Sequence, residues 1–182
     1  MANYFSKPYL REIRDEFIRT KSSFALNEAM NQRTRAKFVS EVSVFLSHKH
    51  DERYIIEQTV AFFKALNVTV YLDWLDEGMP KSTSGTTAKR IKEKISVCKK
   101  FILLATEGAI ASKWCNWELG IGDVKKYPQH IAVMPITESK DNRWSGNEYL
   151  QIYPIIRFDY NISDSYVELQ GKRERFSNWL KQ

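Results

Sequence analysis

The chain has 182 residues, of which 43% are hydrophobic and 13% aromatic, enough for one ordinary core and too few for two full domains. The net charge of +6 permits an anionic partner, but the basic runs are interleaved with other residues as on solvated helix faces, which argues against nucleic-acid binding. No uncharged apolar stretch is long enough for a membrane span or a signal peptide, so we expect a soluble, cytoplasmic protein without membrane contact.

The first forty residues carry helical patterns. Apolar residues recur at helical spacing over 8–20, and Pro8 suits a first helical turn, so we predict an amphipathic helix there. A second helical pattern covers 24–38. We therefore predict an N-terminal helical extension over 1–40, docked on the domain or on another subunit, and a main domain over 41–182.

From residue 42 onward, short runs with high strand propensity alternate with helical patterns. Asp51 is suited to cap the first of these helices and Asn67 to end it. Five strands separated mostly by helices indicate an open parallel sheet with helices on both faces. We predict strands at 42–47, 68–73, 100–106, 131–136 and 155–159, and further helices at 86–97, 109–126 and 166–180.

In such sheets ligands bind beyond the carboxyl ends of the strands, which here means after Ser47, Asp73 and Thr106. A polar loop rich in turn-forming residues follows the second predicted strand at 76–85. Cys98 and Cys115 have neither CxxC spacing nor further Cys or His partners, so neither a disulfide framework nor a structural zinc site is indicated.

Three motifs resemble those of a known family. Val-Phe-Leu-Ser-His at 44–48 resembles the first box of TIR domains, in which a strand ends in a serine-bearing turn. Val-Tyr-Leu-Asp at 70–73, with the loop after it, is similar to the family's second strand and BB loop. Ser-Lys-Trp-Cys-Asn-Trp-Glu-Leu at 112–119 matches the signature S-x-W-C-x-x-E-L. The motifs occur in the family's order, and the arrangement is most similar to Thoeris-type TIR proteins of bacterial antiphage defence.

The resemblance implies a flavodoxin-like α/β fold with a five-stranded parallel sheet in the order 2-1-3-4-5. It also implies cleavage of NAD at the nicotinamide–ribose bond by Glu118, followed by cyclisation to a cyclic ADP-ribose isomer that activates a separate effector as a second messenger. NAD is then a substrate, and no cofactor is expected. Other TIR protomers are the implied protein partners, because TIR enzymes commonly assemble to complete the pocket.

The residues themselves support a site at this place. Trp114 and Glu118 are four apart on a predicted helix, so their side chains share one face. The nicotinamide of NAD is already positively charged and leaves as a neutral molecule, so one carboxylate that stabilises the oxocarbenium-like ribose suffices. The ring of Trp114 or Phe45 can stack on the pyridinium, with a cation–π contribution of about 0.5 to 2 kcal/mol.

We predict that Glu118 is catalytic and that several neighbouring side chains bind the substrate. For three of these residues a purely structural role is the alternative. Ser47 can cap the turn after the strand, Phe45 can belong to the core, and Glu118 can be a solvated helix residue. Cys115 packs rather than attacks, because no histidine is near it in sequence. The predicted walls of the nicotinamide and ribose pocket are Phe45, Ser47 and Trp114, and the looser candidates are Asp73, Trp74, Met79 and Cys115.

The residues at the strand ends also bear on two other chemistries. His48 and His50 are two apart and can converge on a metal, but no further His or Cys lies nearby in sequence, so we predict no metal site and a role for His50 in shaping the helix start. Asp73 occupies the place of a response-regulator phosphoacceptor, but the acidic pair needed after the first strand is missing.

Three rival functions remain open at this point. A non-enzymatic TIR module that binds other TIR domains would tolerate neutralisation of Glu118. An enzyme resembling nucleoside deoxyribosyltransferases would prefer deoxynucleosides to NAD. Nucleic-acid binding driven by charge would weaken steeply with salt. The polar loop at 81–87 departs from the shorter apolar passage of many TIR domains, so the contacts of receptor adaptors are not carried over.

Overall fold

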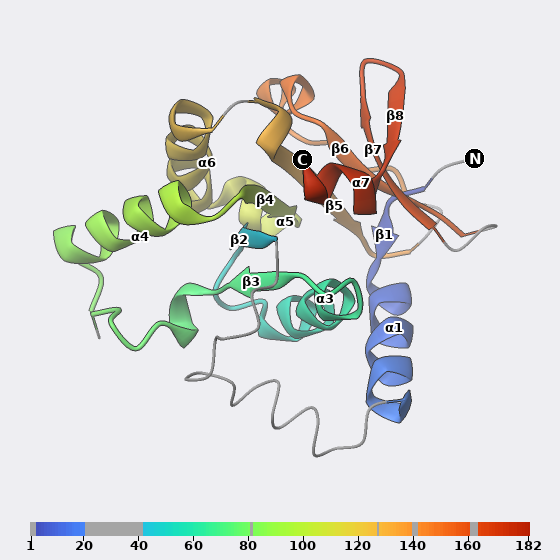
Figure 1. Cartoon of the computed structure of the whole chain (residues 1–182), viewed down its shortest axis with the longest axis horizontal. Helices are drawn as coiled ribbons and strands as arrows, with labels where there is room; N and C mark the ends of the chain where they lie inside the picture. Colours follow the sequence, from blue (N-terminus) through green and yellow to red (C-terminus); the bar gives the residue numbers. More distant parts are fainter. Residues whose placement is uncertain (1–2, 21–41, 81, 127, 140–141, 161–163) are drawn as a thin grey trace.

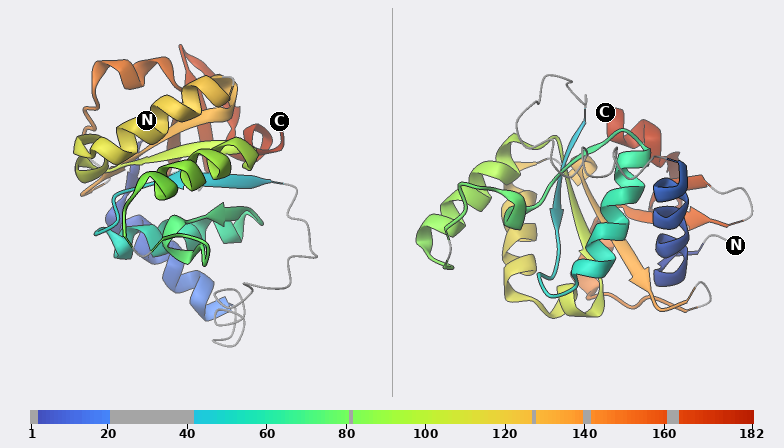
Figure 2. Two further views of the ribbon diagram at one scale, coloured as in Figure 1. Left: turned by 90° about the vertical axis from the view of Figure 1, so that its left-hand side faces the viewer. Right: turned by 90° about the horizontal axis from the view of Figure 1, so that it is seen from below.

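The computed structural model describes residues 3–20, 42–80, 82–126, 128–139, 142–160 and 164–182. A twisted sheet crosses the middle of this part of the chain, and helices cover both of its faces (Figures 1 and 2). Its centre consists of parallel strands in the order β3-β2-β4-β5-β6, which is 2-1-3-4-5 in the numbering of the predicted strands. These strands are β2 (Ser43–Ser47), β3 (Thr69–Tyr71), β4 (Lys100–Ala105), β5 (Ile131–Thr137) and β6 (Ile155–Asp159).

Alternate residues of the central strands feed two cores, one on each face of the sheet. In β4, Ile102 and Leu104 point to one core, whereas Phe101 and Leu103 point to the other. This is the two-residue period of a strand that is buried on both faces. Helices α1 (Lys7–Thr20) and α3 (Arg53–Ala65) cover the first face, and α4 (Gly85–Val97) and α6 (Lys113–Lys125) cover the second (Figure 2).

The N-terminal segment is part of this architecture. Strand β1 (Phe5–Ser6) pairs in parallel with the end of β5, and α1 packs beside α3 (Figure 1). Phe5 and Leu10 are completely buried in the first core. The predicted helix at 8–20 is confirmed, and it docks on the domain of its own chain. The helix predicted at 24–38 lies outside the described residues.

The prediction of a closing helix at 166–180 is wrong. Strands β7 (Asp164–Leu169) and β8 (Lys172–Arg175) form an antiparallel hairpin on the edge of β6, and only α7 (Phe176–Lys181) is helical. The turn residues Gln170 and Gly171 both have positive φ, 50° and 79°, which is the backbone of a two-residue hairpin turn. The sheet is therefore wider than the predicted five parallel strands: the described residues form eight strands.

Two helix boundaries also differ from the predictions. Asp51 does not cap α3: Glu52 is the N-cap residue, and its carboxylate accepts a hydrogen bond from the Thr106 hydroxyl at 2.5 Å. Asn67 does end this helix, with a φ of 58°. The single helix predicted at 109–126 is two helices, α5 (Glu107–Ala111) and α6, because Ser112 adopts an extended backbone and its hydroxyl accepts a hydrogen bond from the Cys115 amide.

Candidate active site

The site lies where the ends of two neighbouring strands meet α6. Ser47 is the last residue of β2, and Asp73 opens the 3-10 helix η1 (Asp73–Leu75) that follows β3. Glu118 lies in the second turn of α6, which packs across β2 and β4. Parallel strands bring their carboxyl ends to the same edge, so residues far apart in sequence converge here.

Glu118 is a buried acid with one hydroxyl partner. The residue is 6% exposed, and its Oε2 accepts a hydrogen bond of 2.6 Å from the Ser47 hydroxyl. Burial raises the pKa of Glu118 to about 7: the Ser47 hydrogen bond opposes this rise, the negative charge of Asp73 adds to it, and His50 opposes it. The group therefore changes its charge near neutral pH.

A cavity of about 380 Å³ opens beside this acid, which is within the size range of small-molecule sites. Five of the eight predicted site residues line it: Asp73, Trp74, Met79, Trp114 and Glu118. Sequence reasoning did not assign six further lining residues to the site, which are His50, Asp76, Pro80, Thr83, Thr87 and Ile91.

Trp114 stands on the same helix one turn before Glu118. It is 38% exposed, and its ring meets that of Trp117 edge to face with centroids 5.2 Å apart. Trp117 is partly buried and packs against the second core, so it anchors the pair, and Trp114 is the more exposed ring. The outer ring of Trp114 is available to a ligand in the cavity.

The other three predicted residues lie behind the pocket wall. Phe45 is 2% exposed and stacks between Tyr71 and Phe101, with both pairs of ring centroids 5.5 Å apart, so it packs in the core and is not among the residues that line this cavity. Cys115 is also buried outside the lining, and burial raises the pKa of its thiol to about 11, which agrees with packing rather than attack. Ser47 reaches the site only through its hydrogen bond to Glu118.

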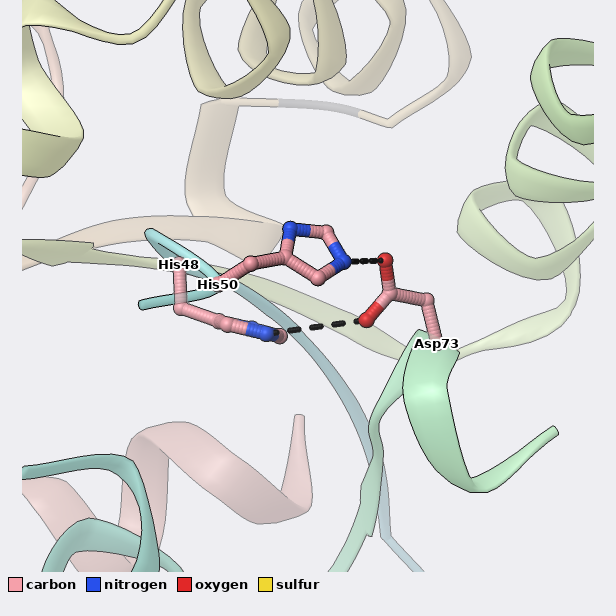
Figure 3. Close-up of side chains that lie close together, drawn as sticks. All are labelled: His48, His50 and Asp73. Atoms are coloured by element: carbon pink, nitrogen blue, oxygen red, sulfur yellow. Dashed lines mark ion pairs between the residues drawn. The ribbon is translucent and has the colours of Figure 1, made fainter. Parts of the chain in front are cut away.

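Asp73 joins two histidines from the turn after β2 (Figure 3). Its Oδ2 is 2.6 Å from Nε2 of His50, and its Oδ1 is 3.6 Å from Nε2 of His48. Burial favours the neutral form of Asp73, but the hydrogen bond from His50 and the electrostatic attraction of the neighbouring histidine side chains outweigh it and lower the pKa of the carboxyl. The same hydrogen bond raises the pKa of His50, which lines the cavity together with Asp73.

Asp76 lines the cavity and anchors the loop that follows η1. Its carboxylate accepts hydrogen bonds from the Arg90 guanidinium at 2.6 and 2.8 Å, from the Tyr71 hydroxyl at 2.8 Å and from the Gly78 amide at 3.0 Å. The Arg90 hydrogen bonds keep the pKa of Asp76 far below its usual range. The Asp-x-Gly spacing at 76–78 is a turn signal that the sequence alone could have revealed. The partner Arg90 is 14 residues away, and no local pattern points to it.

Comparisons with known proteins agree with these motifs. The profile of the TIR domain family matches residues 44–169. Over 147 residues the chain is 32% identical to the "Probable 3' cyclic ADP-D-ribose synthase ThsB'" of Bacillus cereus (strain MSX-D12), an alignment that covers 76% of this chain and 75% of that protein. Among the described helices, none combines the length and apolar character needed to span a bilayer.

Proposed function

The chain belongs to the TIR domain family, and on this premise we propose that it cleaves NAD between nicotinamide and ribose with Glu118 as the catalytic carboxylate. The observation that carries the proposal is the position of Glu118, a nearly buried acid that faces a ligand-sized cavity with the Trp114 ring one helical turn away. The likeness to a protein named as a cyclic ADP-ribose synthase supports the same substrate.

The cleavage step needs little beyond this carboxylate. The bond between the ribose anomeric carbon and the pyridinium nitrogen breaks, and the electron pair leaves with nicotinamide, which becomes neutral. Glu118 then stabilises the positive charge that develops on the ribose, in a site from which much of the water is excluded. The leaving group is already activated by its charge, so NAD serves as substrate and no separate cofactor is required.

We propose that the adenosine ribose of the same molecule captures the cation and closes a ring. Its 3′-hydroxyl forms the new bond to the anomeric carbon and loses its proton, giving the cyclic product named for the Bacillus relative. With a pKa of about 7, Glu118 is basic enough to accept this proton. Water at the same carbon would instead yield ADP-ribose, so positioning and water exclusion decide the product.

The wider setting is part of the proposal. We infer a cytoplasmic enzyme of antiphage defence whose cyclic product diffuses to a separate effector. Association with further TIR protomers is also proposed: Trp114 lines the cavity and is 38% exposed, so a neighbouring protomer could cover it.

The test is incubation with NAD and separation of the products by chromatography and mass spectrometry, with and without extract of phage-infected cells. The wild type is expected to release nicotinamide and a product lighter than ADP-ribose by one water. Glu118→Gln is expected to lose at least about 99% of this activity, because one preorganised charge at such a site contributes about 10²- to 10³-fold. Glu107→Gln, the same change at an exposed position of α5, serves as the matched control and keeps the activity.

The rival interpretation gives the opposite pattern. If neither the wild type nor the control consumes NAD under any condition, while TIR partners still bind equally to wild type and Glu118→Gln, the chain is an interaction module. Release of base from deoxynucleosides in preference to NAD would instead assign it a deoxyribosyltransferase-like activity.

A further inference from the structure

Three potential metal ligands from two different strand ends meet at the edge of the sheet. His48 and His50 lie in the turn after β2, and Asp73 lies after β3 (Figure 3). One ligand atom of each residue can be chosen so that all three lie within 4.8 Å of one another. The sequence offered no third ligand within this turn, and the pairing of β2 with β3 supplies it.

The buried histidine of this cluster has a nitrogen without a hydrogen-bond partner. The His48 side chain is 4% exposed, and its Nδ1 lies 2.7 Å from the carbonyl oxygen of Leu46. A carbonyl oxygen only accepts, so Nδ1 carries the proton and Nε2 of the neutral ring presents a lone pair. Among the described residues Nε2 has no hydrogen-bond partner, and it faces the Asp73 carboxylate at 3.6 Å.

A lone pair that faces a carboxylate is unfavourable unless a positive centre lies between them. A cation bound between Nε2 of His48 and the Asp73 carboxylate would supply such a centre. The backbone contact at Nδ1 is the arrangement that orients a histidine for metal binding through its other nitrogen. The amide of Trp74 likewise orients Asp73 by donating to its Oδ1 at 2.8 Å.

We propose that His48, His50 and Asp73 bind a first-row divalent transition-metal ion of the Zn²⁺ class. Two imidazole nitrogens and one carboxylate oxygen are a ligand set typical of zinc sites that keep a fourth position open. Ligand atoms around a tetrahedral zinc lie roughly 3.3 Å apart. The three ligand atoms lie within 4.8 Å of one another, so binding requires the side chains to move, and the His50 side chain has room to do so because it is 63% exposed.

An ion held by these residues would lie at the wall of the candidate active-site cavity. His50 and Asp73 both line this cavity, so a ligand there would contact the ion directly. The cleavage proposed above does not call for a metal, and the site is therefore an addition to that function. Its test measures cation binding alone, so its outcome is independent of any activity toward NAD.

The experiment is calorimetric titration of tag-free, chelator-treated full-length protein with Zn²⁺, repeated with Co²⁺ under an absorption spectrometer. Wild type is expected to bind one Zn²⁺ per chain and to give the visible bands of tetrahedral Co²⁺ without a thiolate charge-transfer band. His50→Gln and Asp73→Asn are expected to weaken Zn²⁺ binding by at least about tenfold. This is the lower limit for loss of a residue that only supports a metal ligand, and loss of a ligand itself should cost at least as much.

The chain provides its own control, because its third histidine lies at the other end of the strands. His130 stands just before β5, with its Nδ1 2.9 Å from the Lys100 ammonium, and His130→Gln is expected to bind Zn²⁺ like wild type. His50→Gln changes an exposed side chain, so it keeps the fold and its thermal transition without metal. Absence of saturable Zn²⁺ binding to wild type overturns the proposal, as does binding that survives in both cluster variants.

Discussion

Glu118 combines a position inside the protein with a pKa of about 7, and this has a consequence for the pH dependence of the proposed reaction. The carboxylate form is the one that stabilises the ribose cation, and it is lost as the pH falls below the pKa. The raised pKa therefore reduces activity on the acid side of neutrality, where an ordinary glutamate with a pKa of about 4.3 would still be charged.

We expect kcat/KM for NAD to rise about tenfold per pH unit up to about pH 7 and to level off above it, since this ratio reports the ionisation of the free enzyme. Initial rates of nicotinamide release between about pH 5 and 9 check this. In His50→Gln the rise should move to higher pH, because the positive charge of His50 opposes the upward shift of the Glu118 pKa. A level profile through pH 6 would show that Glu118 is charged throughout and would contradict its raised pKa.

Helix α6 carries both Trp114 and Glu118, and its two glycines have different surroundings. Gly120 is exposed, and a Cβ built there meets nothing within 4 Å. A Cβ on Gly122 would lie 3.2 Å from a ring carbon of Phe101 on β4. The close approach of helix to strand at Gly122 therefore fixes the distance at which α6 holds Glu118 from the strand ends.

The two alanine substitutions are expected to act in opposite directions. Gly120→Ala should raise the free energy of unfolding by about 0.5 to 1 kcal/mol, because it removes backbone freedom from the unfolded chain. Gly122→Ala has the same gain but adds overpacking of about 1 to 3 kcal/mol, so the net change should be destabilising. Urea denaturation of the two variants beside wild type measures both, and equal stabilisation by the two would refute the close contact.

At the scale of the whole molecule, the first described residues complete the core. Strand β1 extends the sheet beside β5, where Phe5 meets the ring of Phe62 on α3 edge to face, and α1 packs beside α3. Two arginines of α1 contact Tyr54 on α3. Nε of Arg11 donates a hydrogen bond to the Tyr54 hydroxyl at 2.6 Å, and the guanidinium of Arg14 lies over the Tyr54 ring. This segment contributes core residues, so its removal should affect the folding of the domain.

One helix offers both the test and its control. Leu10→Ala should lower the free energy of unfolding by about 2 to 5 kcal/mol, because Leu10 is completely buried. Ile18→Ala, at a position on α1 that is 40% exposed, should change it by less than about 0.5 kcal/mol. Thermal or urea unfolding followed by the tryptophan signal reports on the domain itself. If Leu10→Ala leaves this transition unchanged, α1 is a separate appendage.

Local patterns in the sequence were sufficient for the parts of the site that a single helix defines. Trp114 and Glu118 share a face because 3.6 residues make a turn, and this holds wherever the helix lies. The same kind of pattern identified the buried central strand β4, whose apolar run has no polar interruption. The hairpin of β7 and β8 was missed because residues 166–180 also satisfy a helical spacing, and pairing with β6 decides between the two.

The sequence by itself determined the alternation of strands and helices, the doubly covered sheet and the placement of Trp114 and Glu118 one turn apart on α6, because each depends on spacing along one segment. Only the tertiary structure decided that Phe45 turns into the core, that Ser47 meets Glu118 across 71 residues, and that Asp73 faces His48 and His50. The physical reason is that these contacts depend on the register between neighbouring strands, which results from packing the whole sheet and is not encoded in any one of its strands.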